Sequence, residues 1–360
     1  MYSKNYTEAR QKFLSLAQTC GAEIKSFPIS AQGVQGEDLA IDVAILGAKN
    51  PRKVVMVTSG LHGVEGFLGS AIQCAWLDNL RRNPVDWGSH AVVLCHALNP
   101  YGFSWQRRVN ENNVDLNRNF IFPKQQFLGA PPLLKKLKWL QKPVSVHNKL
   151  FMIDLYLYGS ILYHTYDAFK NCLILGQFEY PQGLFYGGKK YEEATQIINS
   201  QLNSWTRQAP YVFHLDFHTG LGKYGNCHLL TFEGSEAKRT GWLQSKFGKD
   251  KIEFYGTGLV IWGVPTALMG GWVGEHFALE KKKYTYLTAE YGTYPSTSIF
   301  KALYQENRFF NHRGQSYESA KKELMEMFCP ADPIWREKCV TSGISMISQC
   351  LNVVEDDVWE

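Results

Sequence analysis

The sequence lacks any long apolar segment. Among its 360 residues, no run reaches the roughly 18 consecutive apolar residues of a membrane-spanning helix. The first ten residues, MYSKNYTEAR, also lack the apolar stretch of a secretory signal peptide. We therefore expect a cytoplasmic protein with no membrane partner.

A strong charge of one sign is missing as well. The 38 basic residues are interspersed with 33 acidic ones, and the formal net charge is only +5 at pH 7. Proteins that bind nucleic acids usually carry a basic patch or stripe, which this composition does not indicate. We therefore expect no nucleic-acid partner.

Cysteine pairs with metal-binding or redox spacing are absent. The eight cysteines are scattered without a C-x-x-C motif, and Cys74, Cys95 and Cys172 lie in apolar runs, where a free thiol acts as a small hydrophobic side chain. We interpret them as reduced thiols that bind no metal. The chain also has no internal repeat or evident linker. We expect one domain over residues 1–360, in which residues 330–360 form a C-terminal helix and an acidic tail.

Hydrophobic patterns predict alternating strands and helices. Strands are expected at residues 23–28, 39–46, 54–57, 91–98, 211–218, 227–232 and 284–293. Amphipathic helices are expected at residues 6–20, 64–82, 191–205, 296–309, 316–328 and 335–351. This order is typical of an α/β protein with a mixed, mostly parallel twisted sheet that is covered by helices on both faces.

Other segments have weaker patterns. Residues 131–143 favour a helix with a solvated lysine face over a membrane-surface helix, and residues 156–175 favour a helix followed by a strand. Loops are expected at residues 101–120, 181–188 and 267–274, and residues 236–266 receive no assignment.

One strand-to-helix joint carries two candidate ligands. The β-branched run from Val54 to Val57 predicts a buried strand, and a helical pattern follows the turn at Ser59 and Gly60. His62 and Glu65 fall between the two elements, where ligands bind in open α/β sheets. Their spacing lets both side chains point at one Zn²⁺ ion. Taken alone, such a pair is more often a surface histidine and a helix-start glutamate.

Two later strands also end in ionisable residues, His218 and Glu290. A catalytic zinc site usually has three protein ligands and leaves one position for water, so His62, Glu65 and His218 would form a His₂Glu set. His218 lies 153 residues after Glu65, but parallel strands bring such distant ends together. Glu290 is then the candidate that takes a proton from zinc-activated water and delivers it to the leaving group.

The polar segment 101–120 supplies further candidates. Arg108 could stabilise an oxyanion. The planar fork of Arg118 matches a substrate carboxylate, and Asn117 could add an amide donor. A structural salt bridge between Arg118 and Asp115 is the alternative for that arginine.

Four motifs occur in an order that is known from one superfamily. They are H-G-V-E at 62–65, R-V-N-E-N-N-V-D-L-N-R-N-F at 108–120, D-F-H-T-G at 216–220 and A-E-Y-G-T at 289–293. On these residues the chain resembles the zinc carboxypeptidase superfamily, the carboxypeptidase A-like metallopeptidases that also include aspartoacylase and succinylglutamate desuccinylase. The resemblance covers most of residues 53–310. With the G-L-F-Y-G-G stretch at 183–188, it is strongest to a bacterial branch, the domain-of-unknown-function 2817 (DUF2817) group.

The resemblance implies a zinc carboxypeptidase-like fold and a role for each motif. His62, Glu65 and His218 would bind one zinc ion per chain, with Glu290 as general base and acid. Arg108 would polarise the carbonyl group, unless the neighbouring Arg107 does so. Asn117 and Arg118 would bind the substrate carboxylate.

The implied activity is hydrolysis of an amide bond adjacent to a free carboxylate, in a peptide or a small molecule. Deacylation of an N-acyl amino acid is the first alternative, and a non-enzymatic zinc-binding protein is the second. His214 is a less favoured alternative to His218, with Asp216 as a partner of the metal-binding histidine. Tyr224 and Tyr255 are candidates for the tyrosine that caps the substrate in peptidases. No oligomeric state is predicted.

Overall fold

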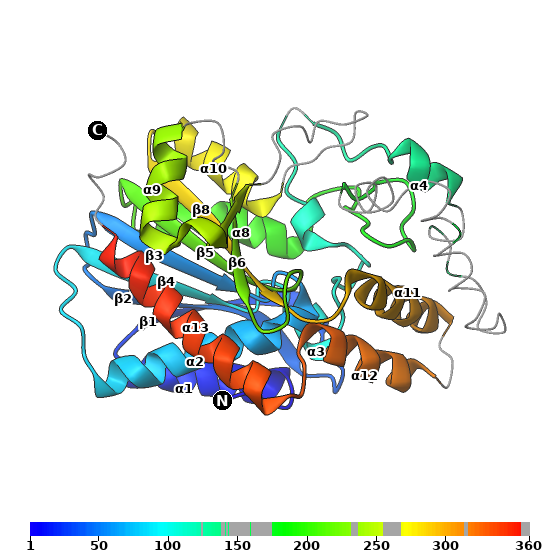
Figure 1. Ribbon diagram of the computed structural model, residues 1–360, viewed down its shortest axis with the longest axis horizontal. Coiled ribbons are helices and arrows are strands. Elements are labelled where there is room, and N and C mark those ends of the chain that lie inside the picture. The colour runs from blue at the N-terminus through cyan, green and yellow to red at the C-terminus, as the bar shows by residue number, and fades with distance from the viewer. Residues whose placement is uncertain are drawn as a thin grey trace.

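One mixed sheet organises the molecule (Figure 1). The computed structural model describes residues 1–123, 125–137, 141, 143, 159, 175–231, 237–254, 268–312 and 316–353. Within these residues, eight strands form the sheet in the order β1-β2-β4-β3-β5-β8-β6-β7. Their bounds are β1 Glu23–Gln32, β2 Asp38–Gly47, β3 Lys53–Ser59, β4 His90–His96, β5 Tyr211–Gly220, β6 Cys227–Thr231, β7 Ile252–Phe254 and β8 Lys283–Gly292.

The centre of the sheet is parallel. β4, β3, β5 and β8 lie side by side in the same direction, whereas β1, β2 and β6 add antiparallel pairings outside them. The central strands are buried over almost their whole length, as expected for strands with helices on both faces. The predicted fold class, a mixed and mostly parallel sheet covered by helices, is confirmed.

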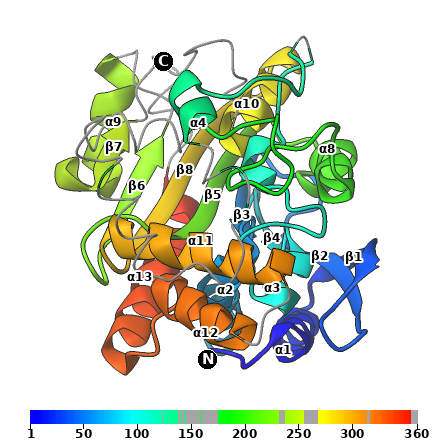
Figure 2. The same cartoon turned by 90° about the vertical axis from the view of Figure 1, so that its right-hand side faces the viewer.

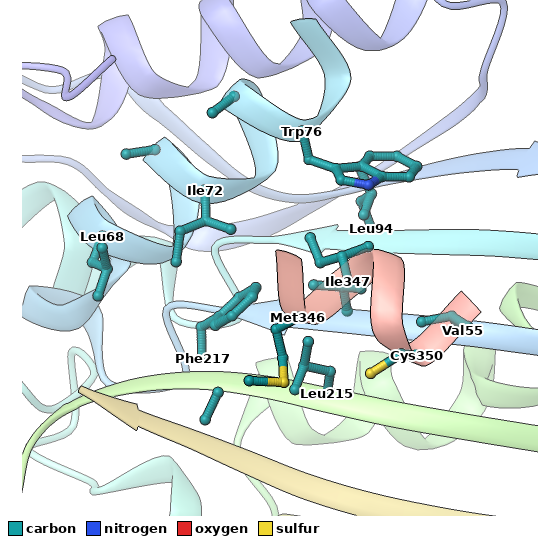
Figure 3. Packing of buried hydrophobic residues seen from close by; sticks show 14 of the residues in the cluster. Val55, Leu68, Ile72, Trp76, Leu94, Leu215, Phe217, Met346, Ile347 and Cys350 are labelled. Atoms are coloured by element: carbon teal, nitrogen blue, oxygen red, sulfur yellow. The ribbon is translucent and has the colours of Figure 1, made fainter. Parts of the chain in front are cut away.

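One face is covered by α1 Tyr6–Thr19, α2 Gly66–Arg82 and α13 Pro333–Asn352, and α9 Ala237–Phe247 packs into the same apolar layer. Figure 3 shows side chains of α2, α13 and the central strands pointing toward one another, among them Ile72, Met346 and Leu215. The last turn of α13 is tied to the sheet, because the buried Lys53 ammonium donates to the carbonyl oxygens of Leu351 and Val353. Burial of this apolar layer therefore fixes α2, which begins directly after Glu65.

The opposite face is covered by α8 Glu193–Trp205 and α10 Met269–Leu279. Residues 267–274 were expected to form a loop, and that prediction is wrong for the part from Met269 onward. The glycines of this helix allow a close approach to the sheet, since a Cβ atom on Gly270 would overlap the Tyr286 ring. Burial of Trp272, Val273 and Phe277 then outweighs the low helix propensity of glycine.

Two C-terminal helices and several short helices lie around the carboxyl ends of the central strands. Figure 2 shows α11 Ser296–His312 and α12 Tyr317–Phe328 side by side in front of these ends. Near them lie the helix α3 Pro100–Trp105 and the short 3₁₀ helices η1 Gly63–Glu65 and η2 Leu116–Arg118. Segment 101–120 is thus less irregular than expected, because Asn99 caps α3 and Pro100 occupies its first turn.

The remaining predictions have mixed outcomes. The expected strands and amphipathic helices are confirmed to within a few residues, apart from an unpredicted extension of β1. The structure adds α9 Ala237–Phe247, the 3₁₀ helix η3 Lys249–Lys251 and β7 in the unassigned segment. Where a helix was expected at 131–143, the short helix α4 Pro132–Lys136 ends at Leu137, and most of the residues after it lie outside the described ranges. Most of segment 156–175 and the acidic tail from residue 354 lie outside the described residues. A single domain remains our prediction.

The structure also bears on the cysteines and on membrane-spanning helices. The cysteines within the described ranges are free thiols, and Cys172 lies outside these ranges. Among the described helices, none is long and apolar enough to cross a membrane.

Candidate metal centre

The joint between β3 and α2 is held in place by its backbone. His62 has an extended conformation just before η1, and Gly63 packs so closely on α3 that a Cβ atom would overlap the backbone of Gly102. The amides of Gly63 and Val64 donate to the carbonyl oxygens of Arg108 and Arg107, at 3.2 and 2.8 Å. These bonds tie the two candidate ligands of this joint to the arginine segment.

His62, Glu65 and His218 converge at the ends of β3 and β5. One ligand atom from each lies within 4.8 Å of the other two, and all three side chains are buried. The Nδ1 atoms of the histidines are 2.9 and 3.0 Å from the two carboxylate oxygens of Glu65 and 3.2 Å from each other. The sequence predicted this set, and the structure brings its members together.

Each histidine is held from behind by a second carboxylate. Nε2 of His62 lies 3.2 Å from Asp115 Oδ1, and Nε2 of His218 lies 2.7 Å from Asp216 Oδ2. A carboxylate on the far nitrogen turns the near nitrogen toward a metal and raises its basicity. Two imidazole nitrogens and one carboxylate with such partners therefore fit a zinc ion.

The electrostatics of the cluster also favour a cation. Burial disfavours a charged imidazole, but the carboxylates of Asp216 and Glu65 raise the pKa of His218 well above its usual value. Burial would raise the pKa of Glu65, yet it is lowered by the charges and hydrogen bonds of His62 and His218. The carboxylates thus draw positive charge into the space between the ligand atoms.

Arg108, and not Arg107, contacts this cluster. Its Nη1 donates to Glu65 Oε1 at 3.1 Å, its Nε donates to Asp115 Oδ2 at 3.1 Å, and its Nη2 lies 2.8 Å from His62 Nε2. Burial would raise the pKa of Asp115, but Arg108 and then His62 hold it well below its usual range. The Arg108 side chain is 15% exposed, so it lies at the border between the cluster and the surface.

Arg107 points the other way. Its Nε donates to Glu306 Oε1 at 2.7 Å, and its guanidinium lies 3.4 Å from the centroid of the Phe310 ring. Both contacts are with α11, and the arginine side chain is fully buried. Arg107 therefore holds segment 101–120 against α11, while Arg108 faces the candidate site.

Glu290 lies directly beside the cluster in the sheet. It pairs with His218 in the parallel register of β5 and β8, so both side chains are on the same face. Its Oε1 accepts a hydrogen bond from the Leu221 amide at 2.9 Å. Burial, together with the negative charge of Glu65, raises the pKa of Glu290 to about 7. A carboxyl group with this pKa can both accept and donate a proton near neutral pH.

Asn117 and Arg118 lie on η2, immediately after Asp115. The side-chain oxygen of Asn117 accepts a hydrogen bond from the Met269 amide at 3.0 Å, which joins η2 to the start of α10. Arg118 is mostly buried, packs against Gly176 and contributes to the low pKa of Asp115. The structure thus places both residues on the same short helix beside the cluster.

The alternatives are resolved in part. His214 is outside the cluster and contacts Thr58 and Tyr284. The Tyr224 hydroxyl donates to Asp332 at 3.2 Å, and its ring packs on Tyr294. Tyr255 lies outside the described residues.

Sequence reasoning treated Asp115 only as a partner of Arg118 and missed its contacts with His62 and Arg108. Its place two residues before Asn117, within the arginine-bearing motif, is the signal that could have singled it out.

Comparison with protein families gives one match. A family profile described as a protein of unknown function, DUF2817, matches residues 2–342. No curated protein matches the chain.

Solved structures share the fold at low sequence identity. A metallo-carboxypeptidase from Burkholderia cenocepacia has 12% identity and a TM-score of 0.51, over 97% of this chain and 68% of that one. A metallo-carboxypeptidase from Pseudomonas aeruginosa, in complex with (2-guanidinoethylmercapto)succinic acid, has 12% identity and a TM-score of 0.46 over 97% and 70% of the two chains. Bovine thrombin-activatable fibrinolysis inhibitor, in complex with tick carboxypeptidase inhibitor, has 11% identity and a TM-score of 0.44 over 96% and 98%. The first of these likenesses supports a shared fold.

Proposed function

The chain belongs to the DUF2817 family, and from that premise we propose that it is a zinc-dependent hydrolase that cleaves an amide bond next to a free carboxylate, as a metallocarboxypeptidase does. The observation that carries the proposal is the convergence of His62 Nδ1, Glu65 and His218 Nδ1 beside Glu290. The fold shared with a metallo-carboxypeptidase agrees with it.

The metal would be held by His62, Glu65 and His218, with Asp115 and Asp216 orienting the two imidazoles. A zinc ion in this place lowers the pKa of water and polarises a carbonyl oxygen. One such site predicts about one zinc ion per chain.

Glu290 would transfer a proton from the attacking water to the leaving group. Its Oε1 is fixed by the Leu221 amide, which leaves Oε2 as the oxygen that takes a proton and returns it to the leaving nitrogen. A pKa of about 7 suits both steps, because the two forms of the carboxyl group are then close in free energy at neutral pH.

The arginines would bind the substrate. Arg108 presents two guanidinium nitrogens toward the ligand cluster, where they can donate to a developing oxyanion. Arg118 and Asn117 would bind the free carboxylate from η2, where a guanidinium can donate two parallel hydrogen bonds. This division gives Arg108 one task and the pair Asn117 and Arg118 another.

The test combines metal analysis with a substrate screen. The purified protein should carry about one zinc ion per chain and hydrolyse peptides with a free C-terminus. Peptides and N-acyl amino acids are offered side by side, because exclusive cleavage of the latter would identify a deacylase instead. Glu290→Gln should retain the metal and lose turnover, whereas the exposed Glu318→Gln should behave as wild type. Hydrolysis by a metal-free protein, or full activity of Glu290→Gln, would overturn the proposal.

A further inference from the structure

A chain of buried polar groups continues from the centre into the sheet. His214, Asp216 and His218 alternate along β5, so their side chains share one face of the strand. All three are buried within a layer that otherwise consists of apolar side chains of α8, α10 and the sheet. Polar groups in such a place need partners, and Thr58 on β3 and Tyr284 and Tyr286 on β8 supply them.

The hydrogen bonds on the β3 side can run in one direction only. Thr58 Oγ1 lies 2.6 Å from Asp216 Oδ1 and 2.8 Å from His214 Nε2. An ionised carboxylate only accepts, so the single hydroxyl hydrogen of Thr58 goes to Asp216. His214 must then donate from Nε2 to Thr58 and accept at Nδ1 from the Tyr284 hydroxyl, which is 2.7 Å away.

The β8 side reaches the other oxygen of the same carboxylate. The Tyr286 hydroxyl donates to Asp216 Oδ2 at 3.2 Å and accepts from Thr288 Oγ1 at 3.0 Å. Nε2 of His218 donates to this same Oδ2 at 2.7 Å. Asp216 therefore receives hydrogen bonds from its own strand β5 and from both neighbouring strands, β3 and β8, and each bond restricts the rotation of its carboxylate.

We infer that Thr58, His214 and Tyr286 are positioning residues for the metal centre: through Asp216 they fix the orientation of His218 and hold a hydrogen on its Nε2, which leaves Nδ1 as the nitrogen available to a metal beside Glu65. The inference rests on the proposed metal site. It adds residues that touch neither metal nor substrate, because they act on a ligand through its carboxylate partner.

The arrangement has no simpler purpose in packing. A histidine at position 214 contributes less to an apolar layer than leucine or phenylalanine, and burial lowers the pKa of His214 to about 4, which keeps it neutral. The neutral ring can donate at one nitrogen and accept at the other, as the chain of hydrogen bonds requires. The direction of the whole chain is thus set by the Asp216 carboxylate, which can only accept.

Metal affinity is the appropriate readout, because it does not depend on turnover. The zinc dissociation constant is measured by competition with a chromogenic chelator, and the visible absorption of the Co²⁺-loaded protein reports the ligand geometry. Thr58→Val removes the hydroxyl group with little change of shape and should weaken zinc binding about tenfold, the lower end of the effect for partners of metal ligands. It should also shift or broaden the Co²⁺ bands. Thr58→Ser keeps the hydroxyl and should restore both.

Thr285→Val is the matched control. Thr285 is a buried threonine on β8 whose hydroxyl contacts Tyr211 on the opposite face of the sheet. Its loss should lower the stability of the metal-free protein without changing zinc affinity or the Co²⁺ spectrum. Tyr286→Phe should weaken zinc binding less than Thr58→Val, because its hydrogen bond to Asp216 is longer.

The outcomes separate the two proposals. If the wild-type protein binds no zinc, the proposed function fails before any variant is compared. If the wild type binds zinc and Thr58→Val binds it equally well with an unchanged Co²⁺ spectrum, only the positioning role is overturned. Equal losses of affinity in Thr58→Val, Thr58→Ser and Thr285→Val would also overturn it, since they would reflect general packing.

Discussion

Replacing Glu290 with glutamine should stabilise the metal-free protein at neutral and alkaline pH. In the folded chain the pKa of Glu290 is raised from its ordinary value of 4.5 to about 7, by burial and by the charge of Glu65. A carboxyl group that ionises later in the folded state lowers stability as pH rises between the two values, because the unfolded chain releases its proton first. Glutamine is never ionised and keeps the acceptor for the Leu221 amide.

The size of the effect follows from the shift. A difference of about 2.5 pKa units, at about 1.4 kcal/mol per unit, corresponds to about 3–4 kcal/mol above pH 7. Well below pH 4.5 the carboxyl group is protonated in both states, so Glu290→Gln and wild type should then unfold with the same free energy. The gain should appear between these pH values and level off above about pH 8.

The assay is urea unfolding of chelator-treated protein at several pH values, with the difference in unfolding free energy plotted against pH. Glu37→Gln is a control of opposite sign. Burial opposes ionisation of Glu37, but hydrogen bonds from the Ser104 hydroxyl and backbone amides lower its pKa, so this variant should lose stability as pH rises. A pH-independent difference for Glu290→Gln would refute the assignment of Glu290 as a buried carboxyl group with a raised pKa.

Three further predictions concern the arginines. Arg108→Lys keeps the charge but loses the planar fork, and should lower kcat by about 10²–10³-fold in steady-state kinetics with little change in unfolding; unaltered kcat would rule out its role. Arg107→Met should instead destabilise the protein by about 3–5 kcal/mol in urea, because it leaves Glu306 buried without its partner; loss of activity at full stability would reverse the two assignments. Arg118→Ala should raise KM for substrates with a free carboxylate and leave KM for amidated analogues unchanged. An equal change of KM for both kinds of substrate would mean that Arg118 does not bind the substrate carboxylate.

The ligand-bearing joint could be predicted because local patterns define it. A β-branched run, a turn with glycine and a helical period follow one another around His62 and Glu65, and each has a local physical cause. The ends of β5 and β8 were equally visible from their apolar runs. The adjacency of these two strands was not, because the register of His218 with Glu290 depends on pairing across the intervening chain.

The helix at Met269–Leu279 could not be predicted from propensity. Gly270, Gly271 and Gly274 argue for a loop, and the advantage of glycine appears only when the Tyr286 ring of β8 is known to pack against Gly270. By contrast, the short helix after Asn99 had a local signal, a capping asparagine followed by proline, which was interpreted as a turn.

The choice between Arg107 and Arg108 also required the tertiary structure. The two side chains are adjacent and chemically identical, so no local rule separates them. Glu306 and Phe310, about 200 positions later in the chain, bind Arg107 and thereby turn Arg108 toward the ligand cluster.

The parallel core has a consequence for the order in which the molecule forms. Glu65 and His218 meet across a sequence separation of 153 residues, and β3, β5 and β8 are joined only by such non-local pairings. Contacts of high sequence separation form slowly, because the entropy of closing the chain must be overcome first. The N-terminal β-strands can associate early, yet they bring together only two of the three candidate ligands, His62 and Glu65. Under the proposed function, metal uptake would therefore be a late event, because only chains with a complete central sheet bring all three candidate ligands together. Bound metal would then distinguish folded molecules from folding intermediates.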